Sequence, residues 1–172
     1  AREPKHEGAV EALNKLLEDE TYRLDVSKIL ENVYATNEQY DKLVDILEIQ
    51  CEIESDPEAQ VELLKRIADI QQNQLSNYMG AFEAYARIVV LDQSEDNINQ
   101  IEALSDVNNN PAALVDVYHK VVEAVYDADS QVAFTNRIAD IQLNRLEDVA
   151  AAEQSYKDTL EIAADDATAL NA

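Results

Sequence analysis

Apolar residues recur along most of this chain at the three- and four-residue spacing of an amphipathic helix. One stripe runs through Leu43, Val44, Leu47 and Cys51, and another occupies positions 114–125. Apolar positions at i, i+3, i+4 and i+7 share one face of a helix, whereas a half-buried strand alternates at every second residue. The pattern therefore predicts an all-α protein.

Capping residues divide this pattern into nine or ten predicted helices. A side chain that can cap a helix stands before a first-turn proline at Asp56-Pro57 and Asn110-Pro111. Further residues of capping type stand at Asn77, Ser94, Asp129 and Asp148. The predicted helices cover residues 8–19, 23–36, 39–54, 57–75, 78–92, 95–107, 111–127, 130–146 and 149–163, with a short tenth at 166–171.

The sequence RIADIQ occurs twice, at 66–71 and at 137–142, so its copies lie 71 residues apart. Flanking positions agree at the same offset, since Leu43-Val44-Asp45 corresponds to Leu114-Val115-Asp116. Half of this period, about 35 residues, is the length of a helical hairpin. A single hairpin cannot bury its apolar face alone, so stacked hairpins reuse the same contacts. We interpret six residues as repeated for packing: Ile67, Ala68, Ile70, Ile138, Ala139 and Ile141.

The apolar positions of two hairpins resemble the tetratricopeptide repeat. In the first hairpin the resemblance rests on Leu64, Ile67, Ala68, Ala81, Tyr85 and Ile88, and in the second on Ile138, Ala139, Ala152, Tyr156 and Thr159. The chain departs from the family where Gln71 and Gln142 replace an aromatic residue, where Gln93 replaces a proline, and where Glu31 and Glu102 replace small residues. Each of these two hairpins also has one extra residue before its second helix.

The resemblance implies an α-solenoid, a right-handed superhelix of helical hairpins that forms one array over residues 1–172. A related helical-hairpin solenoid remains the alternative. Because the chain opens with Ala1 and enters a helical pattern within a few residues, we expect it to be a piece of a longer protein.

The composition is typical of a helical domain, and the net charge excludes some classes of binding partner. The 172 residues include only two glycines and three prolines, and 47% are hydrophobic, which is enough for a buried core. The net charge of −23 repels nucleic acid and anionic membranes, so we expect neither as a partner. No apolar run approaches the roughly 18 residues of a membrane span. The single cysteine, Cys51, is expected to be a buried thiol.

Residues that carry catalysis or bind cofactors are scarce. The two histidines, His6 and His119, have no second histidine or cysteine at ligand spacing. Only Gly8 and Gly80 are available for a phosphate-binding loop, and no nucleophile motif is present. We therefore predict a protein without enzymatic activity, metal or cofactor. The eight tyrosines mostly occupy apolar positions, and we assign most of them to packing.

The predicted function is a scaffold that binds a partner protein or peptide. In the family that the chain resembles, the first helix of each hairpin lines the inner groove. The resemblance implies a groove lined by twelve residues, termed the polar row: Lys28, Asn32, Lys65, Arg66, Asp69, Gln72, Asn73, Asn99, Asn136, Arg137, Asp140 and Asn144.

Two alternatives stay open at this point. Arg66 and Arg137 could simply pair with Asp69 and Asp140, three residues further along the same helix, with no partner involved. The chain could also be an assembly module that associates with another copy of itself through exposed stacking faces at the ends of the array.

Overall fold

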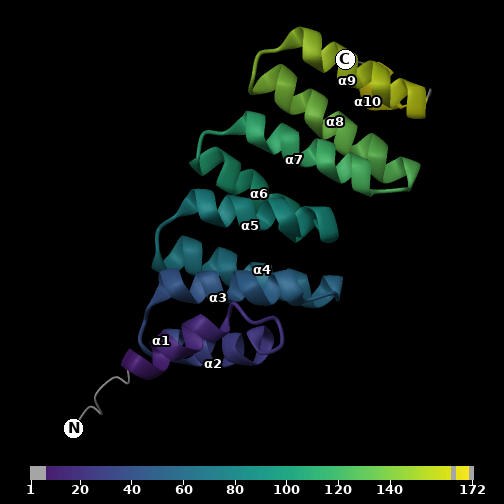
Figure 1. The fold of residues 1–172 in the computed structure, drawn as a ribbon. Helices are drawn as coiled ribbons and strands as arrows, with labels where there is room; N and C mark the ends of the chain where they lie inside the picture. Colours follow the sequence, from purple (N-terminus) through teal and green to yellow (C-terminus); the bar gives the residue numbers. More distant parts are fainter. Residues whose placement is uncertain (1–6, 164–165, 171–172) are drawn as a thin grey trace. The chain divides into compact units, whose positions relative to one another are not determined.

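The computed structural model describes residues 7–163 and 166–170, and in these ranges it contains α-helices and one π-helical segment but no strand (Figure 1). This confirms the predicted all-α class. The elements are α1 Glu7–Leu16, α2 Arg23–Thr36, α3 Tyr40–Ile53, α4 Pro57–Asp69, η1 Ile70–Gln74, α5 Tyr78–Leu91, α6 Glu95–Val107, α7 Pro111–Ala124, α8 Ala128–Asn144, α9 Val149–Ile162 and α10 Ala167–Leu170.

The helices recur at the same offset as the sequence. Adding 71 to the bounds of α3 gives those of α7, and adding 71 to the bounds of α5 gives those of α9. The first residues of α4 and α8, Pro57 and Ala128, are also 71 residues apart. The sequence repeat is therefore a repeat of secondary structure, with two hairpins in each period.

Backbone conformation in the connections repeats as well. Positive φ angles occur at Glu38 (55°) and Asn109 (49°), and again at Ser76 (53°) and Glu147 (54°), each pair separated by 71 residues. Glu38 and Asn109 each follow the C-cap residue of a helix, Asn37 after α2 and Asn108 after α6, where a left-handed residue commonly closes a helix. Glycine usually takes this position because other residues are strained there. The chain thus ends these helices without glycine.

Helix starts follow the capping residues closely. Asn110 and Asp148 accept hydrogen bonds from the backbone N–H groups of the residues three positions later. The predicted cap at Asp129 is wrong, because α8 begins earlier and Asp127 accepts the capping bond from Ser130 at 2.8 Å. The predicted cap at Ser94 has the right position, although its hydroxyl makes no capping hydrogen bond.

The chain divides between Ala84 and Tyr85, within α5, into two compact units. In the first unit, residues 1–84, α1 packs against α2, α2 against α3, and α3 against α4. In the second unit, residues 85–172, α6 packs against α7, α7 against α8, α8 against α9, and α9 against α10. Within each unit the neighbours in sequence are therefore neighbours in space (Figure 1).

The repeated apolar residues form the core of each unit. All six residues interpreted as repeated for packing are buried, with exposed fractions between 0% and 9%: Ile67, Ala68, Ile70, Ile138, Ala139 and Ile141. Cys51 is buried as predicted. The packing interpretation of RIADIQ is confirmed for its apolar positions, so its polar positions need a separate explanation.

The extra residue before α5 and α9 is accommodated by a widened helical turn. The N–H of Leu75 donates to the carbonyl of Ile70, and that of Leu146 donates to Ile141, both at 3.0 Å and both across five residues. In the first unit the widened turn is the π-helix η1, whereas α8 continues to Asn144.

Gly80 shows how the two copies differ after this turn. A Cβ atom at Gly80 would lie 2.6 Å from Nδ2 of Asn77 and 2.7 Å from Cδ of Gln71, two side chains joined by a 2.9 Å hydrogen bond. Its counterpart at the repeat offset is Ala151. In that copy Gln142 accepts a 2.8 Å bond from the hydroxyl of Ser155 instead.

Candidate functional site

The polar row lies on the first helix of each hairpin and on η1. The structure places Lys28 and Asn32 on α2, Lys65, Arg66 and Asp69 on α4, Gln72 and Asn73 on η1, Asn99 on α6, and Asn136, Arg137, Asp140 and Asn144 on α8. Five of these residues thus belong to the second unit and seven to the first.

Three members of the polar row come together in the first unit. Lys65, Arg66 and Asp69 line a shallow depression on α4, with Glu62 and Ile70 completing its wall. Ile70 is buried and is the apolar residue of this lining, whereas the other four lining residues are charged. A side chain that enters this depression could therefore meet both charged groups and apolar surface.

Arg66 forms an ion pair with Glu31 on α2, which is 35 residues earlier in the chain. The carboxylate of Glu31 also accepts a 2.8 Å hydrogen bond from Nε2 of Gln50 on α3. Burial raises the pKa of Glu31, but hydrogen bonds from Arg66 and Gln50 outweigh it and lower that pKa below its usual value. Three helices of the first unit thus meet at one ionised carboxylate.

Arg137 makes the equivalent ion pair in the second unit. Its Nη1 atom donates to Glu102 on α6 at 2.9 Å, again across 35 residues. Glu102 also accepts a 2.7 Å hydrogen bond from the phenol of Tyr118 on α7. Burial and the neighbouring Glu102 carboxylate raise the pKa of Tyr118 well above its usual range. Glu31 and Glu102 therefore have the same role in their two units.

Arg137 has a second acidic partner. Its Nη2 atom donates to Glu95 at the start of α6, also at 2.9 Å. The pairing expected within one helix is wrong, because the structure pairs each arginine with a glutamate of the preceding hairpin. Asp69 and Asp140 instead accept hydrogen bonds of 2.7 Å from the amides of Asn73 and Asn144.

The rest of the polar row is divided between internal contacts and exposed positions. Asn136 donates to Asp166 and accepts from Thr159, both at 3.1 Å. Lys65 lies 3.6 Å from Glu62 in a loose ion pair. The amide of Asn32 donates to the carbonyl of Lys28. Lys28 and Asn99 are exposed, and Gln72 is half-buried.

The sequence analysis missed the glutamates that hold the arginines. Glu31 and Glu102 were noticed only as departures from the tetratricopeptide pattern, at positions where small residues are expected. The available signal was their spacing, because each lies 35 residues before a repeated arginine and 71 residues from the other. The recurrence of a glutamate at both positions was therefore the available indication that this residue makes a repeated contact.

Histidines and other metal-ligating side chains are the remaining candidates for a functional site among the described residues. His119 is exposed on α7, whereas His6 lies outside the described ranges. Across residues 7–163 and 166–170, no group of three or more metal-ligating side chains is assembled, and no helix is long and apolar enough to cross a membrane. No family model matches the sequence, and no curated protein matches it either.

Proposed function

We propose that this chain is a scaffold without enzymatic activity that binds a partner protein or peptide along the first helices of its hairpins. The observation that carries the proposal is the charged depression on α4, which gathers Lys65, Arg66 and Asp69 over buried Ile70. Charged and amide side chains beside an apolar floor can bind both the backbone and the side chains of an extended peptide. No metal or cofactor is part of this role.

The proposed architecture is an α-solenoid of hairpins similar to the tetratricopeptide repeat, in a single array over residues 1–172. Its support is the 71-residue recurrence of helix bounds and of connection geometry. The ion pairs of Arg66 and Arg137 add further support, because each joins the first helices of consecutive hairpins. Small-angle X-ray scattering tests this proposal, since a solenoid gives an elongated profile and a globule does not.

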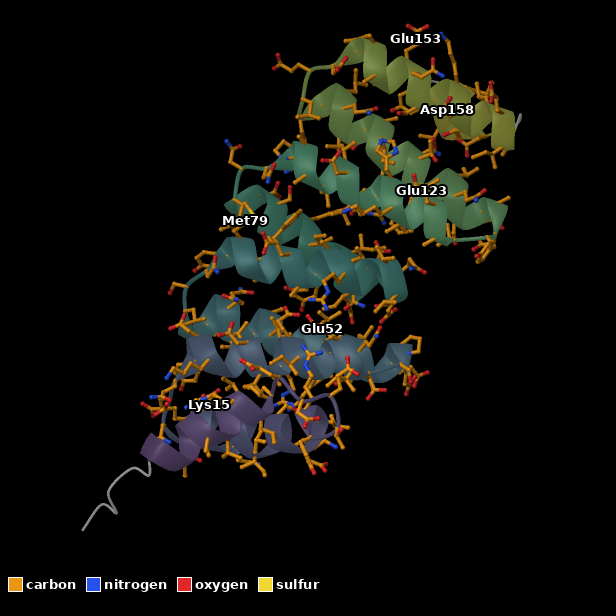
Figure 2. The ribbon with its side chains drawn as sticks, viewed as in Figure 1. Lys15, Glu52, Met79, Glu123, Glu153 and Asp158 are labelled. Atoms are coloured by element: carbon orange, nitrogen blue, oxygen red, sulfur yellow. The ribbon has the colours of Figure 1, made fainter. Side chains whose placement is uncertain are left out.

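The proposed function is tested by capture from a lysate of the source organism. The test variant is Lys65→Ala combined with Asp69→Ala, which removes one charge of each sign from the depression but leaves the Arg66–Glu31 pair. The matched control is Lys157→Ala with Glu153→Ala, which removes an exposed ion pair from α9. Figure 2 labels Glu153 on this helix. Both variants remove one charge of each sign from a helix, at exposed positions except for half-buried Lys65.

A partner should be recovered with the wild-type chain and with the α9 control, and its recovery should fall about tenfold with the α4 variant, which corresponds to about 1.4 kcal/mol. Equal recovery with all three chains would contradict binding at this site. Sedimentation over a range of concentrations distinguishes the alternative of self-association, because an assembly module increases in mass with concentration and a monomeric scaffold does not.

A further inference from the structure

The two repeated arginines differ in the number of carboxylates with which they pair. Arg137 donates through both terminal nitrogens, to Glu102 and to Glu95, and its side chain is 33% exposed. Arg66 donates through Nη2 to Glu31 alone among the described residues, and its side chain is 50% exposed. A guanidinium has five N–H donors in a planar fork. Arg66 therefore has a terminal nitrogen, Nη1, without a hydrogen-bond acceptor among the described residues, whereas Arg137 uses both terminal nitrogens.

One substitution between the copies accounts for this difference. The three residues of the second cluster, Glu95, Glu102 and Arg137, correspond at the 71-residue offset to Leu24, Glu31 and Arg66. Two of the three positions are identical, and the third changes from a glutamate to a leucine. Leucine has no hydrogen-bond acceptor. At the position that a carboxylate fills in the second cluster, the first unit therefore has an apolar side chain, which is 39% exposed.

The surroundings of Arg66 favour an incoming anion more than most of this acidic chain does. Arg66 lines the depression on α4 together with Lys65, whose ion pair with Glu62 is loose at 3.6 Å. Lys28 is close enough to lower the pKa of Glu31 by its charge. Lys28, Lys65 and Arg66 are three of the six basic residues described in the first unit. Glu62 and Asp69 line the same depression, so these cations bring its charge close to balance in a chain whose net charge is −23.

We infer that Arg66 binds the side-chain carboxylate of a glutamate or aspartate in a partner peptide, in the position that Glu95 occupies beside Arg137. The second unit contains this acceptor within its own chain, and the first unit receives it from a partner. A guanidinium binds a planar carboxylate in a charge-assisted pair, and Leu24 contributes apolar contact to the methylene groups of the incoming side chain. The inference rests on the proposed function and adds the chemistry of the partner.

The test uses a displayed library of random twelve-residue peptides selected on the wild-type chain. The selected peptides should share an acidic residue at one position. Leu24→Glu places in the first unit the carboxylate that the second unit already has, so it should pair with Arg66 and weaken peptide binding at least about tenfold. Ile29→Glu is the matched control, since it adds the same charge to an exposed position of α2, about 140° around the helix from Leu24. This control should bind like the wild type.

The reciprocal variant should create a second site. Glu95→Leu frees one side of Arg137, so peptide stoichiometry by calorimetry should rise from one to two, and Arg137→Gln in the same chain should restore one. Peptides that bind equally to wild type and Leu24→Glu would overturn the inference while leaving the scaffold function in place. Failure to select any peptide family, together with no captured partner, would overturn both. Selected peptides with an invariant C-terminus instead of an internal acidic residue would also overturn the inference.

Discussion

The phenol of Tyr118 donates a 2.7 Å hydrogen bond to the carboxylate of Glu102, while its ring meets Phe134 edge to face with centroids 5.3 Å apart. Tyr118 thus connects α7 to α6 through its oxygen and to α8 through its ring. The side chain is completely buried. Loss of its hydroxyl therefore leaves the half-buried carboxylate of Glu102 with one donor fewer.

Tyr118→Phe should lower the free energy of unfolding by about 1–1.5 kcal/mol, because the ring contacts remain while one hydrogen bond to a charged group is lost. Urea denaturation followed by circular dichroism measures this loss. Tyr126→Phe is the matched control, since Tyr126 is 98% exposed and should tolerate the same change without effect. Equal stability of the two variants would show that the Tyr118–Glu102 bond does not stabilise the fold.

Arg137→Gln should destabilise the protein more than Arg66→Gln. Removal of Arg137 leaves Glu102 with Tyr118 as its remaining donor and leaves Glu95 without its partner, and we expect a loss of about 1–3 kcal/mol. Arg66 is more exposed and holds one carboxylate, so its loss should cost about 1 kcal/mol. Denaturant midpoints of both variants check this order, and the reverse order would contradict the occupancy described for the two arginines.

The Arg66–Glu31 pair should make stability depend on pH. The pKa of Glu31 in the folded state lies below its ordinary value of 4.5, so the ionised carboxylate stabilises the fold above that pH. This contribution should disappear as the pH falls through the lower, folded-state pKa. The difference in unfolding free energy between wild type and Glu31→Gln should therefore be largest near neutral pH and shrink below about pH 4.5.

A thermodynamic cycle separates this effect from the other carboxylates. In the Arg66→Gln background, Glu31→Gln should have a smaller and less pH-dependent effect, because the charged donor is already absent. A pH dependence that is unchanged by loss of Arg66 would assign the stabilisation of ionised Glu31 to another group.

Ala81→Leu should overpack the first unit. Ala81 and its counterpart Ala152 lie at matching positions of α5 and α9, where they are 0% and 1% exposed. The expected cost is about 1–3 kcal/mol, measured from the unfolding midpoint. Ala112→Leu on α7 is the control, because Ala112 is exposed and both residues favour helix. Equal midpoints for wild type and Ala81→Leu would show that the predicted repeat register is wrong.

The helices could be predicted from sequence because periodicity and capping act locally. Asp56-Pro57 and Asn110-Pro111 mark starts that the structure confirms. Helix ends carry a weaker signal here, since residues such as Glu38 take the left-handed position that glycine usually occupies. The π-helix η1 was also not predicted, because its widened turn preserves the apolar pattern of the helix before it.

The candidate site could be predicted only as a set of helix faces. The polar row follows from the register of the first helices, but the partners of Arg66 and Arg137 are on other helices and depend on tertiary packing. Local reasoning favoured Asp69 and Asp140 because they lie one turn away on the same helix. Spacing of 35 residues links positions that only the stacking of hairpins brings together.

The alternation of acid and base along the hairpins limits how such a chain can change in length. Glu31, Arg66, Glu102 and Arg137 occur at intervals of 35 or 36 residues, and in each unit the glutamate precedes the arginine with which it pairs. Deletion of one hairpin with its connection, residues 57–92, would move α6 into the place of α4 and bring Glu102 to position 66, opposite Glu31. Two carboxylates would then face each other where an ion pair had been, and their repulsion would destabilise the stack. Deletion of a whole 71-residue period would keep the order intact. Homologous arrays should therefore have gained and lost hairpins in pairs, with the period of 71 residues as the heritable unit.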